Sequence, residues 1–249
     1  MEPLTIRPVS TIVEYDACEE IQRRAWGYRD IDVVPTNELI SVERSGGLVL
    51  GAFLGARMVG FCFGLVGRDH ASGLLYHSSR MVGVDPEFRG RGVAYALKLK
   101  QKAAVLAQGL DLIRWTFEPL EAANAILNLR KLGAEATGYV RDLYGTATTS
   151  PLHQGLGTDR LLVDWWLKRP RRTAEKGSAI EIEIPRDVQA LRSAPREAAS
   201  WRQRTREAFE RAFAAGYVAF DFDPATSRYC LQPRGTAATA PARPATEPT

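Results

Sequence analysis

The sequence predicts a mixed α/β fold of the α+β kind, with helices flanking a mostly antiparallel central sheet. Residues 48–54, 58–66 and 74–84 are apolar runs separated by short glycine-containing turns, which is typical of an antiparallel meander. After residue 86 the apolar positions change to helical spacing, and Gly109 ends that helix. Further strands and helices alternate after it, as in folds whose helices pack on a sheet.

Short apolar runs and capping residues predict the other elements of the first two thirds of the chain. We expect strands at 4–7, 110–117, 135–144 and 161–167, and helices at 12–26, from 35 onward, and at 121–132.

A change of composition after residue 168 predicts the domain limits, with residues 1–168 as the main domain. Residues 169–177 contain no large apolar side chain and are interpreted as a linker. Alternating isoleucines, one helix with an apolar stripe and two further strands predict a β-α-β-β extension at 178–232. Residues 233–249 are rich in Ala, Thr and Pro, which is typical of a disordered tail. We expect the extension to pack on the sheet of the main domain or on a second subunit, so a homodimer stays open.

Composition and charge argue against several classes of protein. The 249 residues are 45% hydrophobic, as in globular chains, and no apolar run approaches the roughly 20 residues that cross a bilayer, so we expect no membrane partner. The N-terminus lacks the pattern of a secretory signal. Because Cys18, Cys62 and Cys230 form no CxxC pair, we expect reduced thiols and a cytoplasmic location. The net charge of +4 is mild and no aromatic residues interleave with the basic run at 168–172, so nucleic acid binding is not expected.

The most informative segment is residues 81–94, where a strand passes through a glycine-rich turn directly into a helix. This geometry points several free backbone N–H groups and the positive end of the helix dipole at one place, which suits an anion. Gly90 and Gly92 let a phosphate approach the backbone closely. The segment lacks the GxxxxGK[ST] of a Walker loop, and a GxGxxG dinucleotide motif fails at Tyr95. A glycine-rich turn that merely caps a helix is the remaining alternative.

The segment resembles the acyl-CoA signature of the GNAT (GCN5-related N-acetyltransferase) superfamily, [QR]-x-x-G-x-[GA], as Arg89, Gly90, Arg91, Gly92, Val93 and Ala94. The order of elements over residues 4–167 is similar to that family as well. Residues 116–133, with the trailing β-α-β-β piece, resemble an uncharacterised subgroup of predicted acetyltransferases. The resemblance implies an acyl-CoA-dependent N-acetyltransferase whose sheet is splayed between its fourth and fifth strands.

By this resemblance the co-substrate is acetyl-CoA or another acyl-CoA, such as succinyl-CoA. The pyrophosphate would bind the backbone amides of residues 91–94. The pantetheine arm would pair with the strand end at Val82, Gly83 and Val84. Asn124 would serve the pantetheine, although it stands two positions later than the family's asparagine. The acceptor would be a small-molecule amine, such as an amino acid, and the rival hypothesis is a non-catalytic acyl-CoA binder with a regulatory or interaction role.

Transfer to an amine requires a base that takes a proton, and an acid assists the departing thiolate. Glu118, at the end of a strand, is a candidate base, and its alternative role is to stabilise a helix start. His77 is a second candidate base, with a structural histidine as the alternative. Tyr144 is the candidate acid, with packing as its alternative, because the family's usual tyrosine is replaced by Leu129. The three histidines have no ligand spacing with the cysteines, so no metal is expected.

Overall fold

The computed structural model describes residues 2–145, 157–174, 179–191 and 193–235. The chain forms two compact units. The first unit is mainly Met1–Arg114, and the second is mainly Trp115–Thr148 with His153–Thr249.

This division falls inside a strand, whereas the sequence indicates a domain boundary at residue 168. The predicted domain limits stay a prediction. Residues 175–177 of the predicted linker, residue 178 at the start of the predicted extension and residues 236–249 of the predicted tail lie outside the described residues.

The first unit contains an antiparallel sheet in which consecutive strands are neighbours, in the order β1-β2-β3-β4. β4 then pairs in parallel with β5, through His77 with Ile113 and Ser78 with Arg114. This ladder covers only the first part of β4, as expected for a sheet that splays between these two strands. The elements are β1 (Leu4–Pro8), α1 (Ile12–Trp26), η1 (Asp30–Asp32), α2 (Thr36–Arg44), β2 (Leu48–Leu54), β3 (Arg57–Arg68), β4 (Leu75–Val84), η2 (Pro86–Phe88), α3 (Val93–Ala107) and the start of β5 (Leu112–Phe117).

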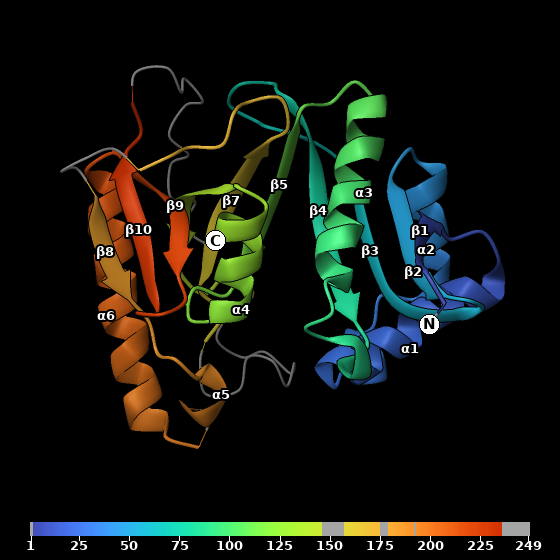
Figure 1. Ribbon diagram of the computed structural model, residues 1–249, viewed down its shortest axis with the longest axis horizontal. Helices are drawn as coiled ribbons and strands as arrows, with labels where there is room; N and C mark the ends of the chain where they lie inside the picture. Colours follow the sequence, from blue (N-terminus) through green and yellow to red (C-terminus); the bar gives the residue numbers. More distant parts are fainter. Residues whose placement is uncertain (1, 146–156, 175–178, 192, 236–249) are drawn as a thin grey trace. The chain divides into compact units, whose positions relative to one another are not determined.

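Helices cover both faces of this sheet (Figure 1). Alternate residues of β3 point to opposite faces, so Phe61 and Phe63 pack with α1 and α2, whereas Cys62 packs with Val93 and Leu97 of α3. The two cores hold α3 against the strands that precede it in the sequence. The start of α3 is therefore held next to the end of β4.

The second unit contains the rest of β5 and a sheet in the order β5-β7-β6-β9-β10-β8. Antiparallel pairing joins β6 to β7 and to β9, β9 to β10, and β10 to β8. Its further elements are α4 (Ala122–Ala125), the π-helix η3 (Ile126–Lys131), β6 (Glu135–Val140), β7 (Arg160–Trp166), β8 (Ile180–Glu183), α5 (Val188–Leu191), α6 (Pro195–Ala214), β9 (Tyr217–Asp223) and β10 (Arg228–Pro233).

The predicted helix at 121–132 is a short α-helix that continues as a π-helix. The N–H of Leu132 donates to the carbonyl of Leu127, five residues earlier. The apolar spacing is preserved through this segment, because Ala125, Leu129 and Leu132 are all buried. Periodicity alone therefore cannot distinguish the two helix types, and π-turns are frequent at functional sites.

The C-terminal extension joins the sheet that contains β6 and β7. Ala136 of β6 pairs with Ala219 of β9, which confirms the expectation that the extension packs on the main sheet. Phe209 of α6 is fully buried, with its ring 5.9 Å from that of Tyr139 on β6 and 5.0 Å from that of Tyr229 on β10. Aromatic contacts across these elements make α6 part of the core of the second unit.

Phe209→Ala is expected to lower the free energy of unfolding by about 3–5 kcal/mol, because it leaves a cavity among aromatic rings. Denaturant unfolding followed by circular dichroism measures the change. Val13→Ala, at a side chain that is 77% exposed, is the control and should change stability by less than about 0.5 kcal/mol. A loss below about 1 kcal/mol for Phe209→Ala would contradict this core.

Candidate functional site

The loop between β4 and α3 presents open backbone at the start of a long helix. Gly90 and Gly92 have φ of +75° and +81°, and among the described residues a Cβ added to either would meet no atom within 4 Å. Gly92 is the N-cap of α3 and has no side chain with which to cap the first turn. First-turn N–H groups lack intrahelical partners and carry the positive end of the dipole, so this loop can bind an anion.

A buried carboxylate fixes the start of the loop. The side chain of Asp85 is 2% exposed and accepts hydrogen bonds from Arg24 and Arg57, each at 3.1 Å. It also accepts from the N–H of Glu87 at 3.2 Å, and Glu87 pairs with the same two arginines at 3.2 and 2.9 Å. Because Arg24 lies on α1 and Arg57 begins β3, the loop is tied to two other elements of the first unit.

The two arginines of the signature have different surroundings. Arg89 donates to the carbonyl oxygen of Ala25, near the end of α1, so its guanidinium helps to hold the loop. The guanidinium of Arg91 lies over the ring of Phe88, 5.2 Å from its centroid, and remains beside the loop. Val93 and Ala94, the other residues of the signature, are in the first turn of α3. The assignment of residues 89–94 to the cofactor stays a prediction.

Residues 82–84 of β4 are paired on one edge, Val82 with Cys62, Gly83 with Phe61 and Val84 with Gly60. The described ladder on the other edge pairs His77 and Ser78 with β5 and does not reach residues 82–84. An added strand, such as a pantetheine arm, requires unpaired backbone groups of this kind.

β4 also contains a bulge that the sequence analysis missed. Phe63 pairs with Met81, but the next residue, Gly64, pairs with Ser79, which leaves Arg80 without a partner in the described register of β3 with β4. Bulges redirect backbone groups and are common next to active sites. This bulge lies between the parallel pairing with β5 and the residues that lead to the loop.

His77 belongs to a buried polar network between β4 and α3. Its Nε2 lies 3.2 Å from the Nε2 of Gln101, and the ring is 0% exposed. The Oε1 of Gln101 accepts from the Nζ of Lys98 at 2.9 Å and from the Oγ of Ser79 at 3.1 Å. Lys98 also donates to the Oγ of Ser79 at 3.0 Å. A buried imidazole does not meet an acceptor amine unless the surrounding structure opens, and its role as a base stays a prediction.

Burial sets the charge of these groups. It lowers the pKa of Lys98 to about 7, and burial with the charge of Lys98 lowers the pKa of His77 to about 4. The thiol of Cys62 lies near Lys98, and burial raises its pKa to about 12. At neutral pH the imidazole and the thiol are therefore neutral, whereas the charge of Lys98 changes there.

Glu118 is ion-paired within the second unit. The Nη2 of Arg202 on α6 donates to Oε2 at 2.8 Å, and its Nη1 forms an ion pair with Oε1 at 2.8 Å. Arg160 of β7 donates to Oε2 at 3.3 Å. The N–H of Leu120 donates to Oε1 at 3.0 Å. A proton taken by this carboxylate displaces at least one of these donors. Glu118 therefore connects β5 with β7 and α6, and its role as a base stays a prediction.

Tyr144 lies on the surface of the second unit, 55% exposed, with the guanidinium of Arg160 5.3 Å from its ring centroid. Asp159, the residue directly before β7, is fully buried. Its carboxylate accepts two hydrogen bonds of 2.8 Å from Arg206 of α6. It also accepts from the hydroxyl of Tyr139 at 2.7 Å. Burial raises the pKa of Asp159, but the hydrogen bonds from Arg206, Tyr139 and the N–H of Asp142, with the charge of Arg202, together lower it.

The sequence analysis did not identify the arginines of α6 as partners of these carboxylates. Arg202 and Arg206 are four residues apart, so they share one face of the helix. That spacing could have indicated a charged face. Asn124, predicted to serve the pantetheine, lies in α4 and is half-buried, and this assignment is also untested.

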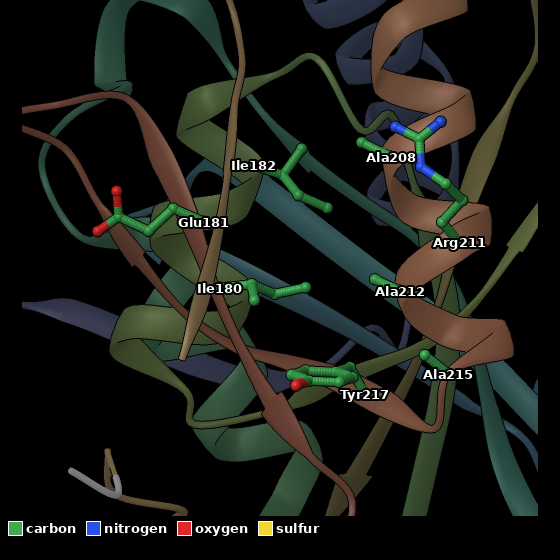
Figure 2. Close-up of a pocket in the computed structure, with 8 residues that line it drawn as sticks. All are labelled: Ile180, Glu181, Ile182, Ala208, Arg211, Ala212, Ala215 and Tyr217. Carbon is green, nitrogen blue, oxygen red and sulfur yellow. The ribbon is translucent and has the colours of Figure 1, made fainter. Parts of the chain in front are cut away.

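An open apolar groove lies between β8 and α6 (Figure 2). Its volume is about 290 Å³, and its lining residues are Ile180, Glu181, Ile182, Ala208, Arg211, Ala212, Ala215 and Tyr217. Figure 2 shows the two isoleucines directed toward α6 and Glu181 directed away. None of the predicted site residues lines this groove.

No protein-family model and no curated protein matches the sequence. Solved structures match its fold. The ribosomal-protein-S18-alanine N-acetyltransferase of Escherichia coli has a TM-score of 0.52 at 18% identity, over 70% of this chain and 98% of its own. A protein assigned to the GNAT family of acetyltransferases, from Desulfovibrio desulfuricans, has a TM-score of 0.51 at 13% identity, over 66% of this chain and 99% of its own. The chain has the GNAT fold. A chain of the NatC complex bound to Gag peptide and CoA also matches, with a TM-score of 0.51 at 13% identity, over 67% of this chain and 99% of its own.

The GNAT fold accounts for nearly the whole length of these neighbours but for 66–70% of this chain. The chain thus contains more than the shared fold.

Within its described part, no helix has both the length and the apolar character needed to cross a membrane. No group of His, Cys, Asp and Glu side chains in that same part could hold a metal ion.

Lys98 is expected to make the free energy of unfolding rise with pH above pH 7, by up to about 1.4 kcal/mol per pH unit. The folded protein releases this proton near pH 7, whereas the unfolded chain retains it to about pH 10.4. The unfolded chain binds more protons in this window, so the contribution is complete at high pH and is lost as pH falls to about 7.

Denaturant unfolding at several pH values between 7 and 10, in the wild type and in Lys98→Met, tests this dependence. The difference between the two curves isolates Lys98 from the cysteines and tyrosines that titrate in the same range. Identical pH dependence in both proteins would show that Lys98 is not a buried amine.

Proposed function

We propose that this protein is an N-acyltransferase that moves the acetyl group of acetyl-CoA to a small-molecule amine in the cytoplasm. The observation that carries the proposal is the open loop of Gly90 and Gly92 at the start of α3, which has the family's acyl-CoA signature in a GNAT fold. The NatC complex shares this fold and was solved with CoA. Because identities are 13–18%, the loop and its sequence support the cofactor more directly than the likeness does.

In this proposal the pyrophosphate of CoA accepts hydrogen bonds from the amides of residues 91–94, where the dipole of α3 and Arg91 add positive potential. The pantetheine arm pairs with residues 82–84 as an added strand. The thioester carbonyl then lies beside the bulge at Arg80, whose backbone N–H groups hold the developing oxyanion. All of these groups belong to the first unit.

The amine attacks the thioester carbon directly in a ternary complex, so a C–N bond forms and the C–S bond breaks. The nitrogen loses a proton to a base, and the CoA sulfur leaves as a thiolate that gains a proton. We assign the base to Glu118, acting through a water, and the acid to Tyr144. Leu129, at the position of the family's usual tyrosine, is fully buried and has no proton to give.

A non-catalytic acyl-CoA binder is the second candidate function. It is favoured by the state of the predicted bases, because Glu118 is ion-paired with two arginines and His77 has no exposed surface. Incubation with acetyl-CoA or succinyl-CoA and a panel of amino acids and amines distinguishes the candidates. Release of free thiol with any amine excludes the pure binder, and mass spectrometry of the products identifies donor and acceptor.

Gly92→Val is expected to abolish binding of CoA, because the branched side chain fills the open space that a phosphate needs. Gly109→Val is the matched control, since Gly109 also has a positive φ, of +79°, open space around it and a place at an end of α3. The two variants therefore carry similar backbone strain.

Calorimetry and thermal unfolding with acetyl-CoA measure the effect. In the wild type and in Gly109→Val, ligand at 100 times its dissociation constant should add about 2.7 kcal/mol of stability. Unchanged affinity in a folded Gly92→Val protein would show that the phosphate binds elsewhere.

Tyr144→Phe is expected to lower kcat and to remove the alkaline limb of its pH profile, since general acids supply about 10²–10⁴-fold. Glu118→Gln should remove the acid limb. The pH–rate profiles of the wild type and both variants, with an acceptor found above, test these roles. If Tyr144→Phe retains the wild-type alkaline limb, the acid is another group, and an unchanged acid limb in Glu118→Gln makes His77 the next residue to test.

A further inference from the structure

Four polar side chains form a closed group in the interior of the first unit. Lys98 and Gln101 come from α3, and Ser79 and His77 come from β4. Each is at most 7% exposed, and three hydrogen bonds of 2.9–3.1 Å join Lys98, Gln101 and Ser79. The group lies beside the core formed by Cys62, Val93 and Leu97. It does not belong to the loop and contains neither Glu118 nor Tyr144, to which the proposed function assigns proton transfer.

Burial of these four polar side chains costs free energy, so stability alone does not explain the group. An amine taken from water into the core loses its hydration, and burial disfavours its charged form. The Nδ1 of His77 has no hydrogen-bond partner in the part of the chain that the structure describes. An apolar side chain of the same length as Lys98 would avoid this cost, since buried charged groups can often be replaced without loss of stability.

The position of the group on β4 indicates its role. Ser79 is the residue directly before the bulge at Arg80, and its Oγ is held by both Lys98 and Gln101. On the same strand His77 lies against Gly64 of β3, where a Cβ would collide with the imidazole and with the carbonyl oxygen of Ser78. Hydrogen bonds and close packing thus fix the backbone immediately before the bulge.

We infer that Lys98 and Gln101 are positioning residues for the acyl carbonyl, which they serve by holding Ser79 and with it the bulged backbone of β4 at Arg80. The inference rests on the proposed function, in which this backbone holds the oxyanion. An oxyanion donor must be in place before the reaction, because movement of the donor during the reaction forfeits much of its effect. The bulge leaves one residue unpaired in the ladder, so contacts from α3 add to what fixes the backbone there.

Lys98→Met tests the inference, because methionine fills the space and leaves the bond between Ser79 and Gln101 intact. Lys100→Met is the matched control, since Lys100 lies on the exposed face of the same helix. In Lys98→Met we expect kcat to fall about 10–10²-fold, with the dissociation constant of acetyl-CoA changed less than about threefold. We also expect its melting temperature to equal or exceed that of the wild type. Lys100→Met should match the wild type in kcat, in the dissociation constant of acetyl-CoA and in melting temperature.

A second readout does not depend on turnover. The carbonyl carbon of acetyl-CoA, labelled with ¹³C, should shift downfield when bound to the wild type, because a hydrogen bond polarises the carbonyl. Lys98→Met should lose most of this shift while it still binds the ligand. Ser79→Ala should give the same result, and it replaces Lys98→Met if that variant does not fold.

The outcomes separate this inference from the proposed function. A wild type that binds acetyl-CoA and shows the carbonyl shift, but releases no thiol with any amine, removes the catalytic function and leaves the positioning role to be decided by the variants. A wild type that binds no CoA overturns both. Wild-type kcat and carbonyl shift in folded Lys98→Met and Ser79→Ala overturn the inference alone.

Discussion

The buried carboxylate of Asp85 is the constraint on which the functional end of the first unit depends. A charge with almost no exposed surface is stable only when it is paired, and two guanidinium groups and one backbone N–H meet that need. Because Arg24 and Arg57 come from α1 and β3, both elements must be folded before the carboxylate can be buried. The same pairs therefore determine where β4 ends and where α3 begins.

The position of α3 in turn determines where its N-terminus and its polar side chains lie. The apolar face of the helix packs on β2 and β3, and Lys98 and Gln101 continue that face with polar groups that reach β4. One helix thus presents its N-terminus to the loop and its middle to the bulge. A displacement of the loop would move both, so under the proposed function phosphate binding would be linked to the geometry at the bulge through this one helix.

Features that depend on neighbours in the sequence could be predicted from it. The helix expected at 12–26 matches α1, and the strand expected at 48–54 matches β2, because apolar spacing and turn residues are local. The loop at 81–94 was recognisable for the same reason. The π-turn was not, since it retains the apolar spacing of an α-helix, and neither was the bulge, since one extra residue leaves little trace in an apolar strand.

Pairs of distant charged residues could not be predicted. Glu118 and Arg202 are 84 positions apart, and Asp159 and Arg206 are 47 apart, so the tertiary structure alone brings them together. Lys98 illustrates a related limit. Helical spacing places it on the buried side of α3 with Gln101, but lysines are so rarely buried that a pattern assigns it to the solvent.

α6 ties the extension to the end of the second unit that contains Glu118 and Asp159. Arg202 and Arg206, one turn apart, each pair with a carboxylate through two guanidinium nitrogens at 2.8 Å, at the end of β5 and at the start of β7. Without the side chain of Arg206, Asp159 would be a buried charge that has lost its main partner, at a cost of several kcal/mol. The segment that carries Tyr144 follows β6, whose Tyr139 packs on α6 and donates to the same Asp159. The residues proposed for proton transfer are therefore held by an element that follows β7 in the sequence, and under the proposed function α6 must be folded before the protein can act.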